Sequence, residues 1–228
     1  MAPISVLNRE LYDIQLAARV LKMPPTTLEW WLEGGRRQGR PYPPVIRDTP
    51  TGSKVVTWGE LVEARYLLAY RRELRVGLPE LRAWINLARE QLGVPYPLAH
   101  QRPWVGEGQK ILTDAQLSVG LPEELWAMYQ VPGGQILLLP PADAFLRRVV
   151  FEHGEVARLR PLGEESPIVI DPQIRFGMAT LKGIPTEAIA EQVEAGDPVE
   201  MVAEDFGLQL AEVAQVLDYE LNLPAAAA

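Results

Sequence analysis

The residues best suited to chemistry in this chain are five closely spaced cations in its front half. They are Arg36, Arg37, Arg40, Arg47 and Lys54. Such side chains neutralise phosphates, and phosphate contacts hold a protein in register on a nucleic acid. Just before them come two hydroxyls and an indole that could reach the edges of bases: Thr26, Thr27 and Trp30. Together the two sets predict a DNA-binding surface, with the cations on phosphates and the second set facing the major groove.

The net charge supports this prediction because it differs in sign between the two halves of the chain. Residues 1–110 hold 16 Lys+Arg against 11 Asp+Glu, a net of +5, whereas residues 111–228 carry a net of −13. The total of −8 hides this difference. A basic surface attracts a polyanion and an acidic surface repels it. We therefore expect only the front half to contact nucleic acid.

Two short helices are expected to position the base-reading set. Apolar residues recur at helical spacing over residues 12–33 until Met23-Pro24 interrupts them, because proline disfavours helix in the residue before it. Pro25 then opens a second helix. This order is typical of a helix-turn-helix, in which the second helix enters the major groove. Taken alone, the segment also fits an ordinary helical hairpin.

The cations are expected to lie on a loop and a hairpin that follow. The glycine-rich, basic run 34–40 is predicted to be a flexible loop. Residues 45–57 hold two β-prone runs joined by a Pro/Gly turn, which predicts a β-hairpin that carries Arg47 and Lys54. A basic hairpin after a helix-turn-helix is a wing, whose cations lie over phosphates or enter the minor groove.

Two longer helices are expected to complete the front half. Thr57 and Glu60 have the spacing of a capping box for a helix over 58–74. A second helix follows Gly77, with Pro79 in its first turn. Its predicted apolar face comprises Leu81, Trp84, Ile85, Ala88 and Leu92. Three arginines near the end of the first helix fit either phosphate contact or attraction to the helix dipole: Arg71, Arg72 and Arg75.

The front half resembles the winged helix of MerR-type regulators over about residues 10–100. The resemblance rests on YDIQLAARVLKMPPTTLEWW, on the two-stranded wing and on VTWGELVEARYLLAYRRELRVGLPELR. It implies a DNA-binding fold. The long dimerisation helix of that family is absent after residue 93, and the chain has no cysteine. A regulator that senses metal or redox state through cysteines is therefore not expected.

Residues 101–165 are predicted to be a connector. Expected elements are a short helix over 121–129 and strands at 135–139, 147–151, 156–160 and 168–170. A turn at 152–155 would join two of these strands into a hairpin. A small sheet and an irregular connector both fit, and prolines favour a domain boundary within 101–120.

Residues 166–223 are predicted to form an acidic three-helix domain for dimerisation or partner binding, with a tail at 224–228. Thr186 and Asp197 are expected to cap its first two helices. By pattern it ends in another helix-turn-helix, but the outward positions of the last helix are Gln209, Glu212, Gln215 and Asp218. Phosphate would repel such a helix. A packing or dimerisation role is therefore expected.

This segment resembles the small helical domain of uncharacterised function found in bacterial VapB-type antitoxins. The resemblance rests on Asp171-Pro172, Phe176-Gly177, Lys182-Gly183-Ile184-Pro185, Ala195-Gly196-Asp197, residues 203–208 and residues 217–220. Met178-Ala179-Thr180 departs from the proline-containing stretch usual in that family. The resemblance implies a transcriptional autoregulator that neutralises a PIN-domain ribonuclease toxin.

The inventory of reactive side chains disfavours an enzyme. His100 and His153 are the only histidines, and neither stands beside a serine or aspartate as a catalytic triad requires. Neither Gly34-Gly35 nor Gly133-Gly134 continues as a phosphate-binding motif. No catalytic residue, metal or cofactor is expected.

The chain is also expected to be cytoplasmic and not bound to a membrane. It has no run of about 18 apolar residues, which a membrane-spanning helix requires. Its start, MAPISVLNRELYD, lacks the pattern of a signal peptide.

These observations predict a mainly α fold with small β elements (α+β). Residues 1–100 would form the winged helix-turn-helix, 101–165 the connector and 166–223 the acidic domain. The predicted function is a sequence-specific transcription regulator that binds double-stranded DNA as a homodimer, neutralises a PIN-domain toxin and represses its own operon. Two alternatives remain open: a standalone regulator or nucleoid-associated protein without a toxin, and an interaction adaptor that does not bind DNA.

Overall fold

The front of the chain folds into the two helices predicted around Met23-Pro24. The computed structural model describes residues 5–73, 77–105, 107–121, 123, 126–130, 136–138 and 140–222. After the 3₁₀ turn η1 (Val6–Asn8) and strand β1 (Glu10–Asp13), α1 spans Ile14–Leu21 and α2 spans Pro25–Glu33. The Asp13 carboxylate caps α1 by accepting from the amide of Leu16 at 2.7 Å. Two helices therefore lie on either side of Met23-Pro24 as predicted, and their assignment as a helix-turn-helix stays a prediction.

The strands after α2 differ from the prediction. The run 34–40, expected to be a loop, begins a hairpin of β2 (Gly35–Arg37) and β3 (Arg40–Tyr42). Its two-residue turn, Gln38-Gly39, has positive φ at both positions, which is the backbone conformation that suits a tight hairpin.

The hairpin predicted at 45–57 is wrong. Within that range the structure has one strand, β4 (Val55–Thr57), and it pairs with β1 instead. The physical reason lies in Arg47, whose side chain donates to the carbonyls of Ser53 and Val55. The guanidinium of Arg47 therefore donates to carbonyls that a partner strand would otherwise pair with.

Two long helices complete the front half as predicted. Helix α3 spans Trp58–Glu73 and α4 spans Leu78–Leu92. The capping box is present, since Thr57 and Glu60 exchange hydrogen bonds of 2.9 and 3.2 Å. The buried face of α4 comprises the five residues expected, Leu81, Trp84, Ile85, Ala88 and Leu92. Short 3₁₀ turns follow at η2 (Pro97–Ala99) and η3 (Arg102–Trp104).

The region 107–146 corrects two expectations. Helix α5 (Glu107–Ser118) lies where a loop and a domain boundary were predicted, and it packs on α4. In place of a helix ending at Tyr129, β5 (Met128–Gln130) pairs with β6 (Ile136–Leu138). The buried Gln116 side chain accepts from the amides of Ala127 and Met128, which holds this segment extended. Residues 122, 124 and 125 of the predicted helix lie outside the described residues.

Helix α6 (Pro140–Leu146) leads into a five-stranded antiparallel sheet. Its strands are β7 (Val149–Glu152), β8 (Glu155–Leu159), β9 (Ile168–Ile170), β10 (Ala179–Leu181) and β11 (Ile184–Pro185), in spatial order β11-β10-β9-β8-β7. The hairpin predicted with its turn at 152–155 is confirmed. A 3₁₀ turn, η5 (Arg175–Gly177), joins β9 to β10. The sheet contains strands from both sides of residue 165, where the predicted connector ends. The predicted domain boundaries stay predictions.

Three helices end the described chain: α7 (Thr186–Glu194), α8 (Val199–Phe206) and α9 (Leu210–Leu221). Their number and order match the prediction, but two of their caps do not. Pro185 and Pro198 hold the N-cap positions expected for Thr186 and Asp197. The Thr186 hydroxyl instead hydrogen-bonds the Ala179 carbonyl and the Glu220 carboxylate. The predicted tail at 224–228 lies outside the described residues.

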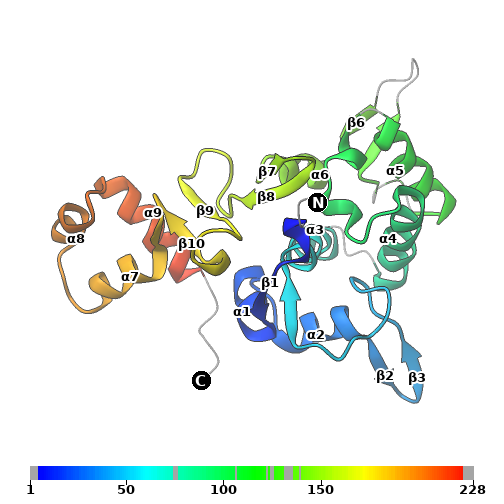
Figure 1. Cartoon of the computed structure of the whole chain (residues 1–228), viewed down its shortest axis with the longest axis horizontal. Coiled ribbons are helices and arrows are strands. Elements are labelled where there is room, and N and C mark those ends of the chain that lie inside the picture. Colours follow the sequence, from blue (N-terminus) through cyan, green and yellow to red (C-terminus); the bar gives the residue numbers. More distant parts are fainter. Residues whose placement is uncertain are drawn as a thin grey trace.

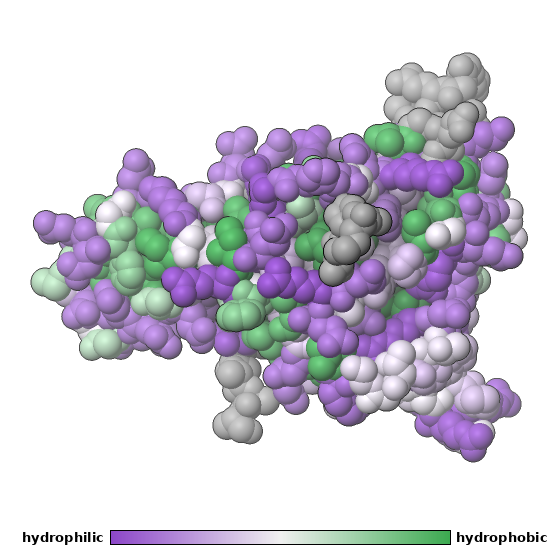
Figure 2. Space-filling view, viewed as in Figure 1, coloured by the Kyte–Doolittle hydropathy of each residue, from purple (hydrophilic) through white to green (hydrophobic). Residues whose placement is uncertain are grey.

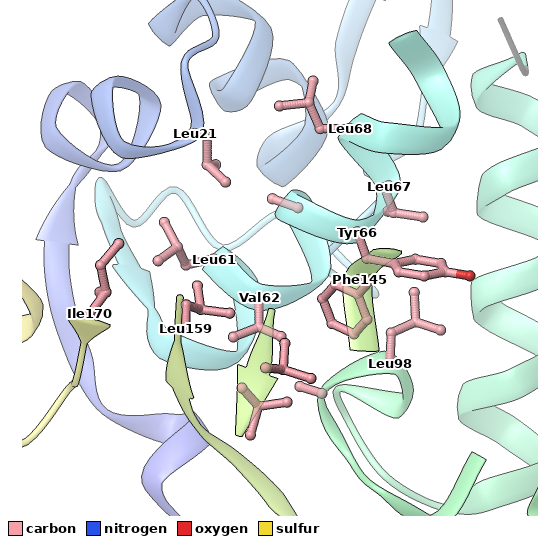
Figure 3. Close-up of a cluster of buried hydrophobic side chains, with 14 of the residues drawn as sticks. Leu21, Leu61, Val62, Tyr66, Leu67, Leu68, Leu98, Phe145, Leu159 and Ile170 are labelled. Atoms are coloured by element: carbon pink, nitrogen blue, oxygen red, sulfur yellow. The ribbon is translucent and has the colours of Figure 1, made fainter. Parts of the chain in front are cut away.

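The structure is therefore mainly helical with small sheets, as the α+β prediction states. In Figure 1 helices α2–α6 lie on the right, α1 lies near the centre, α7–α9 lie at the far left, and the five-stranded sheet runs between α7–α9 and α6. Buried side chains form one continuous core in which α3 is central (Figure 3). No helix in the described part is both long and apolar enough to cross a bilayer.

Candidate nucleic-acid interface

The outer face of α2 carries the three residues predicted to read bases. Leu28, Trp31 and Leu32 are buried on its inner face, which turns the opposite face outward. Thr26 and Thr27 are exposed there, whereas Trp30 is half-buried. The first turn of this helix is therefore open to a ligand that approaches from solvent.

Trp30 also holds the hairpin β2–β3 against α2. Its ring lies 5.8 Å from the ring of Tyr42, measured between centroids. A Cβ on Gly35 would stand 2.7 Å from the Trp30 ring, so the indole packs directly on the strand backbone. Gly34 has φ +65° and ψ −150°, a conformation nearly confined to glycine, and a Cβ there would meet the Tyr42 carbonyl at 2.2 Å. The two glycines thus fix where the hairpin leaves the helix.

The hairpin places three predicted cations in solvent. Arg36, Arg37 and Arg40 are all exposed, and the ladder sets Arg37 directly opposite Arg40. Like charges opposite each other destabilise a hairpin unless an anion lies between them. Figure 2 shows this hydrophilic tip projecting at the lower right of the molecule. The arrangement suits a phosphate.

An open concavity joins the helix and the hairpin. It is lined by Met23, Pro24, Thr26, Thr27, Trp30, Trp31, Arg37, Leu68, Arg71 and Leu78. All three predicted base-reading residues therefore share one surface with Arg37. Arg71 of α3 also reaches this surface, whereas the side chain of Arg72 and all of Arg75 lie outside the described residues.

Arg47 corrects the predicted set of phosphate contacts, because it is buried inside the protein. Only 8% of the residue is exposed. Its Nε donates to Glu60 at 2.6 Å, and its terminal nitrogens bond Glu33 and Thr51 as well as backbone carbonyls. A side chain with these partners holds the segment 51–55 against α2 and α3, and it is not available to DNA.

The two acids of α2 are both compensated by cations. Lys54 is exposed as predicted, but it forms an ion pair with Glu29. Burial opposes the charge on Glu33, yet hydrogen bonds from Gly52 and Thr51 and the charge of Arg47 lower the pKa of its carboxyl. Both acids are therefore neutralised locally, and the hairpin arginines determine the charge of this face.

The acidic helices contact α1 rather than the interface. Arg19 of α1 lies 3.7 Å from Glu187 and 3.6 Å from Glu220, measured between charged atoms. The Tyr12 hydroxyl donates to the Gly177 carbonyl at 2.8 Å. Figure 1 shows α7–α9 far from the hairpin β2–β3. The back half thus covers α1 and leaves α2 open.

Two features of the interface escaped sequence reasoning. The pairing of Arg37 with Arg40 depends on a hairpin whose only local sign is the Gln38-Gly39 turn. The internal position of Arg47 depends on Glu33 and Glu60, which are 14 and 13 residues away along the chain. Among the described residues, no three His, Asp or Glu side chains gather as ligands of a metal ion would.

Three comparisons place the chain among known proteins. A family described as "Protein of unknown function (DUF433)" matches residues 168–219. An uncharacterized protein of Mycobacterium tuberculosis, Rv2308, is 34% identical, with 96% of this chain and 93% of the relative covered. A second protein of that organism, named putative antitoxin VapB45, is 26% identical over 91% of this chain and 92% of its own length.

The fold also matches a solved structure. The crystal structure of Rv2018 from Mycobacterium tuberculosis aligns with a TM-score of 0.73 at 22% identity. The alignment covers 94% of this chain and all of that one. At this identity the likeness establishes a shared fold over nearly the whole length.

Proposed function

The chain belongs to the family of the uncharacterized protein Rv2308 of Mycobacterium tuberculosis, and on that premise we propose that it is a DNA-binding antitoxin. In this proposal it binds its own operator as a homodimer in the cytoplasm, represses its operon and neutralises a PIN-domain ribonuclease. It has no catalytic chemistry of its own. A relative named putative antitoxin VapB45 supports the toxin–antitoxin role.

One observation carries the DNA-binding part of the proposal. The exposed arginines of the hairpin β2–β3 adjoin the exposed first turn of α2, and both acids of α2 are neutralised by cations. In the proposed complex Thr26, Thr27 and Trp30 face the major groove, while Arg36, Arg37 and Arg40 hold phosphates. Two copies would present two such surfaces to a palindromic operator.

The test is the salt dependence of binding to the DNA upstream of the chain's own gene. Replacing Arg36 and Arg37 by Ala removes two phosphate contacts from each protomer, so the slope of log K against log salt is expected to flatten by about 4 for the proposed homodimer. The matched control replaces Arg147 and Arg175, which are exposed elsewhere, and should leave the slope unchanged. Binding that ignores ionic strength, or equal losses in both variants, would contradict the proposed interface.

The antitoxin part has a separate test. The chain is co-expressed with the protein encoded by the adjacent gene, and the two are purified together. We expect a stable complex in which ribonuclease activity is inhibited. An adjacent product that does not bind, together with intact operator binding, would leave a standalone regulator and reject the antitoxin role.

A further inference from the structure

Another hollow lies between the two halves of the chain, away from the nucleic-acid interface. A water-sized sphere can be centred within about 70 Å³ of it, and its mouth is open to solvent. It is lined by Val20, Leu21, Leu61, Arg65, Ala69, Ala144, Phe145, Arg148, Leu159, Arg160, Pro161 and Ile170. These residues come from α1, α3, α6, the strands β8 and β9 and the segments that follow α6 and β8, so the hollow forms only in the folded chain.

The inner wall of the hollow is apolar. Leu21 and Leu61 from the front half lie near Leu159 and Ile170 from the sheet (Figure 3), and Phe145 of α6 also lines the hollow. All five side chains are almost fully buried. A concave site with apolar walls and a few polar groups is typical of a small-molecule site, and its wall favours an apolar ligand.

The polar lining is entirely cationic. Arg65, Arg148 and Arg160 line the hollow, and no Asp or Glu is among its described lining residues. Arg148 is exposed at the mouth. Arg65 donates to the Pro161 carbonyl at 3.5 Å, and Arg160 donates to the Glu164 carbonyl at 2.8 Å. Three guanidinium groups around an apolar hollow match a carboxylate attached to an apolar chain.

We propose that this hollow binds a small amphipathic carboxylate. The apolar chain lies against Val20, Ala69 and Ala144, which cover the buried leucines and Phe145, and the carboxylate accepts hydrogen bonds from the lining arginines. This site is independent of the proposed function, because it shares no lining residue with the interface on α2 and the hairpin.

Calorimetry on the full chain without DNA tests the proposal, with octanoate as the probe. Octanol and octylamine have the same chain with a neutral and a cationic head group. We expect octanoate to bind and both controls to bind at least about tenfold more weakly, as the loss of charged hydrogen bonds implies. Equal binding of octanol, or no binding of octanoate, overturns the proposal.

Two variants locate the site. Arg148→Glu is expected to weaken octanoate binding by about tenfold or more, since it replaces an attractive charge by a repulsive one. Arg147→Glu reverses the neighbouring exposed charge outside the hollow and should leave the affinity unchanged. Ala144→Phe adds a ring at the mouth and should abolish binding while the melting temperature is kept. Octanoate affinity that is equal in wild type, Arg148→Glu and Ala144→Phe places binding elsewhere and overturns the assignment.

Discussion

The helix pairs α1–α2 and α8–α9 share one backbone design. The residue after the first helix is left-handed in both, with φ +56° at Lys22 and +64° at Gly207. The next amide bonds back to the carbonyl five residues earlier, at 2.9 Å from Met23 and 2.8 Å from Leu208. This pattern is the Schellman motif, which ends a helix and turns the chain.

The two pairs differ in what surrounds the second helix. Helix α2 is followed by a hairpin with exposed arginines, whereas α9 has neither Lys nor Arg in its sequence. On α9 the outward Glu212 pairs with Lys182 at 2.9 Å. The two pairs therefore share a backbone pattern and differ in the charge around the second helix. Under the proposed function this charge separates the helix that binds DNA from the helix that does not, because phosphate contacts dominate affinity.

The two helix pairs should differ most in the unfolding free energy that is lost when an ion pair to the second helix is removed. Arg47→Ala leaves Glu33 and Glu60 as partly buried carboxylates, and we expect a loss of about 3–5 kcal/mol of unfolding free energy. Lys182→Ala breaks a surface pair and should cost less than about 1 kcal/mol. Urea unfolding measures both. Equal losses of unfolding free energy would show that the ion pairs of Arg47 with Glu33 and Glu60 stabilise the protein no more than a surface pair does.

Stability against pH should also distinguish the two halves. Burial raises the pKa of Glu63 in α3 from its usual 4.5 to about 8. The unfolded chain releases this proton near pH 4.5 while the folded chain keeps it. The contribution of Glu63 to the free energy of unfolding is therefore largest below pH 4.5. It falls as pH rises towards 8, by up to about 1.4 kcal/mol per pH unit.

Two variants separate this effect from the titration of the back half. Glu63→Gln keeps a neutral side chain and should flatten the decline between pH 5 and 8. The pKa of Glu212 is shifted in the opposite direction, because the Gln209 amide and Lys182 lower it. Its stabilisation is present above pH 4.5 and is lost on acidification, so Glu212→Gln should leave the decline between pH 5 and 8 intact. An unchanged decline in Glu63→Gln would contradict the assignment.

A smaller effect is expected when the acid on each second helix is neutralised. Glu29→Gln releases Lys54 from its ion pair and removes a negative charge from α2. DNA affinity should rise, and the salt slope should steepen by about 2 for the proposed homodimer, since one lysine is released in each protomer. Glu212→Gln makes the same change on α9 and should leave DNA binding unaltered. Fluorescence anisotropy at several salt concentrations measures both, and a response to Glu212→Gln would reverse the roles assigned to the two units.

The smallest effects concern the turn that both pairs share. Gly207→Ala puts a Cβ into a left-handed position and should cost about 1 kcal/mol. Lys22→Gly relieves the same strain but removes the ammonium that lies 5.9 Å from the Tyr219 ring centroid. We expect a gain below about 1 kcal/mol. Thermal melts of the two variants check the opposite signs, and shifts of the same sign would show that the turns are not equivalent.

The helices that carry the interface follow from local sequence, because helical periodicity and caps act over a few residues. The apolar spacing before Pro24, the Thr57–Glu60 capping box and the buried face of α4 are all confirmed. Helix α5 was missed because Gly106-Glu107-Gly108 reads as a loop. Its packing against α4 outweighs this weak local preference.

The candidate site itself was only partly predictable. Five predicted site residues on α2 and the hairpin β2–β3 are exposed, as a DNA-binding surface requires: Thr26, Thr27, Arg36, Arg37 and Arg40. Arg47 was predicted to be exposed, yet it is internal because Glu33 and Glu60 converge on it from two helices. Composition cannot distinguish a cation that faces solvent from one that binds two carboxylates.

The sequence by itself determined the helices α1–α4 and α7–α9 and the opposite charges of the two halves, since these depend on residue type and near neighbours. Tertiary structure decided which cations face solvent, where the hairpin stands and how the acidic helices cover α1. Those outcomes depend on contacts such as Arg47 with Glu60 and Arg19 with Glu220, which form only after distant segments have packed.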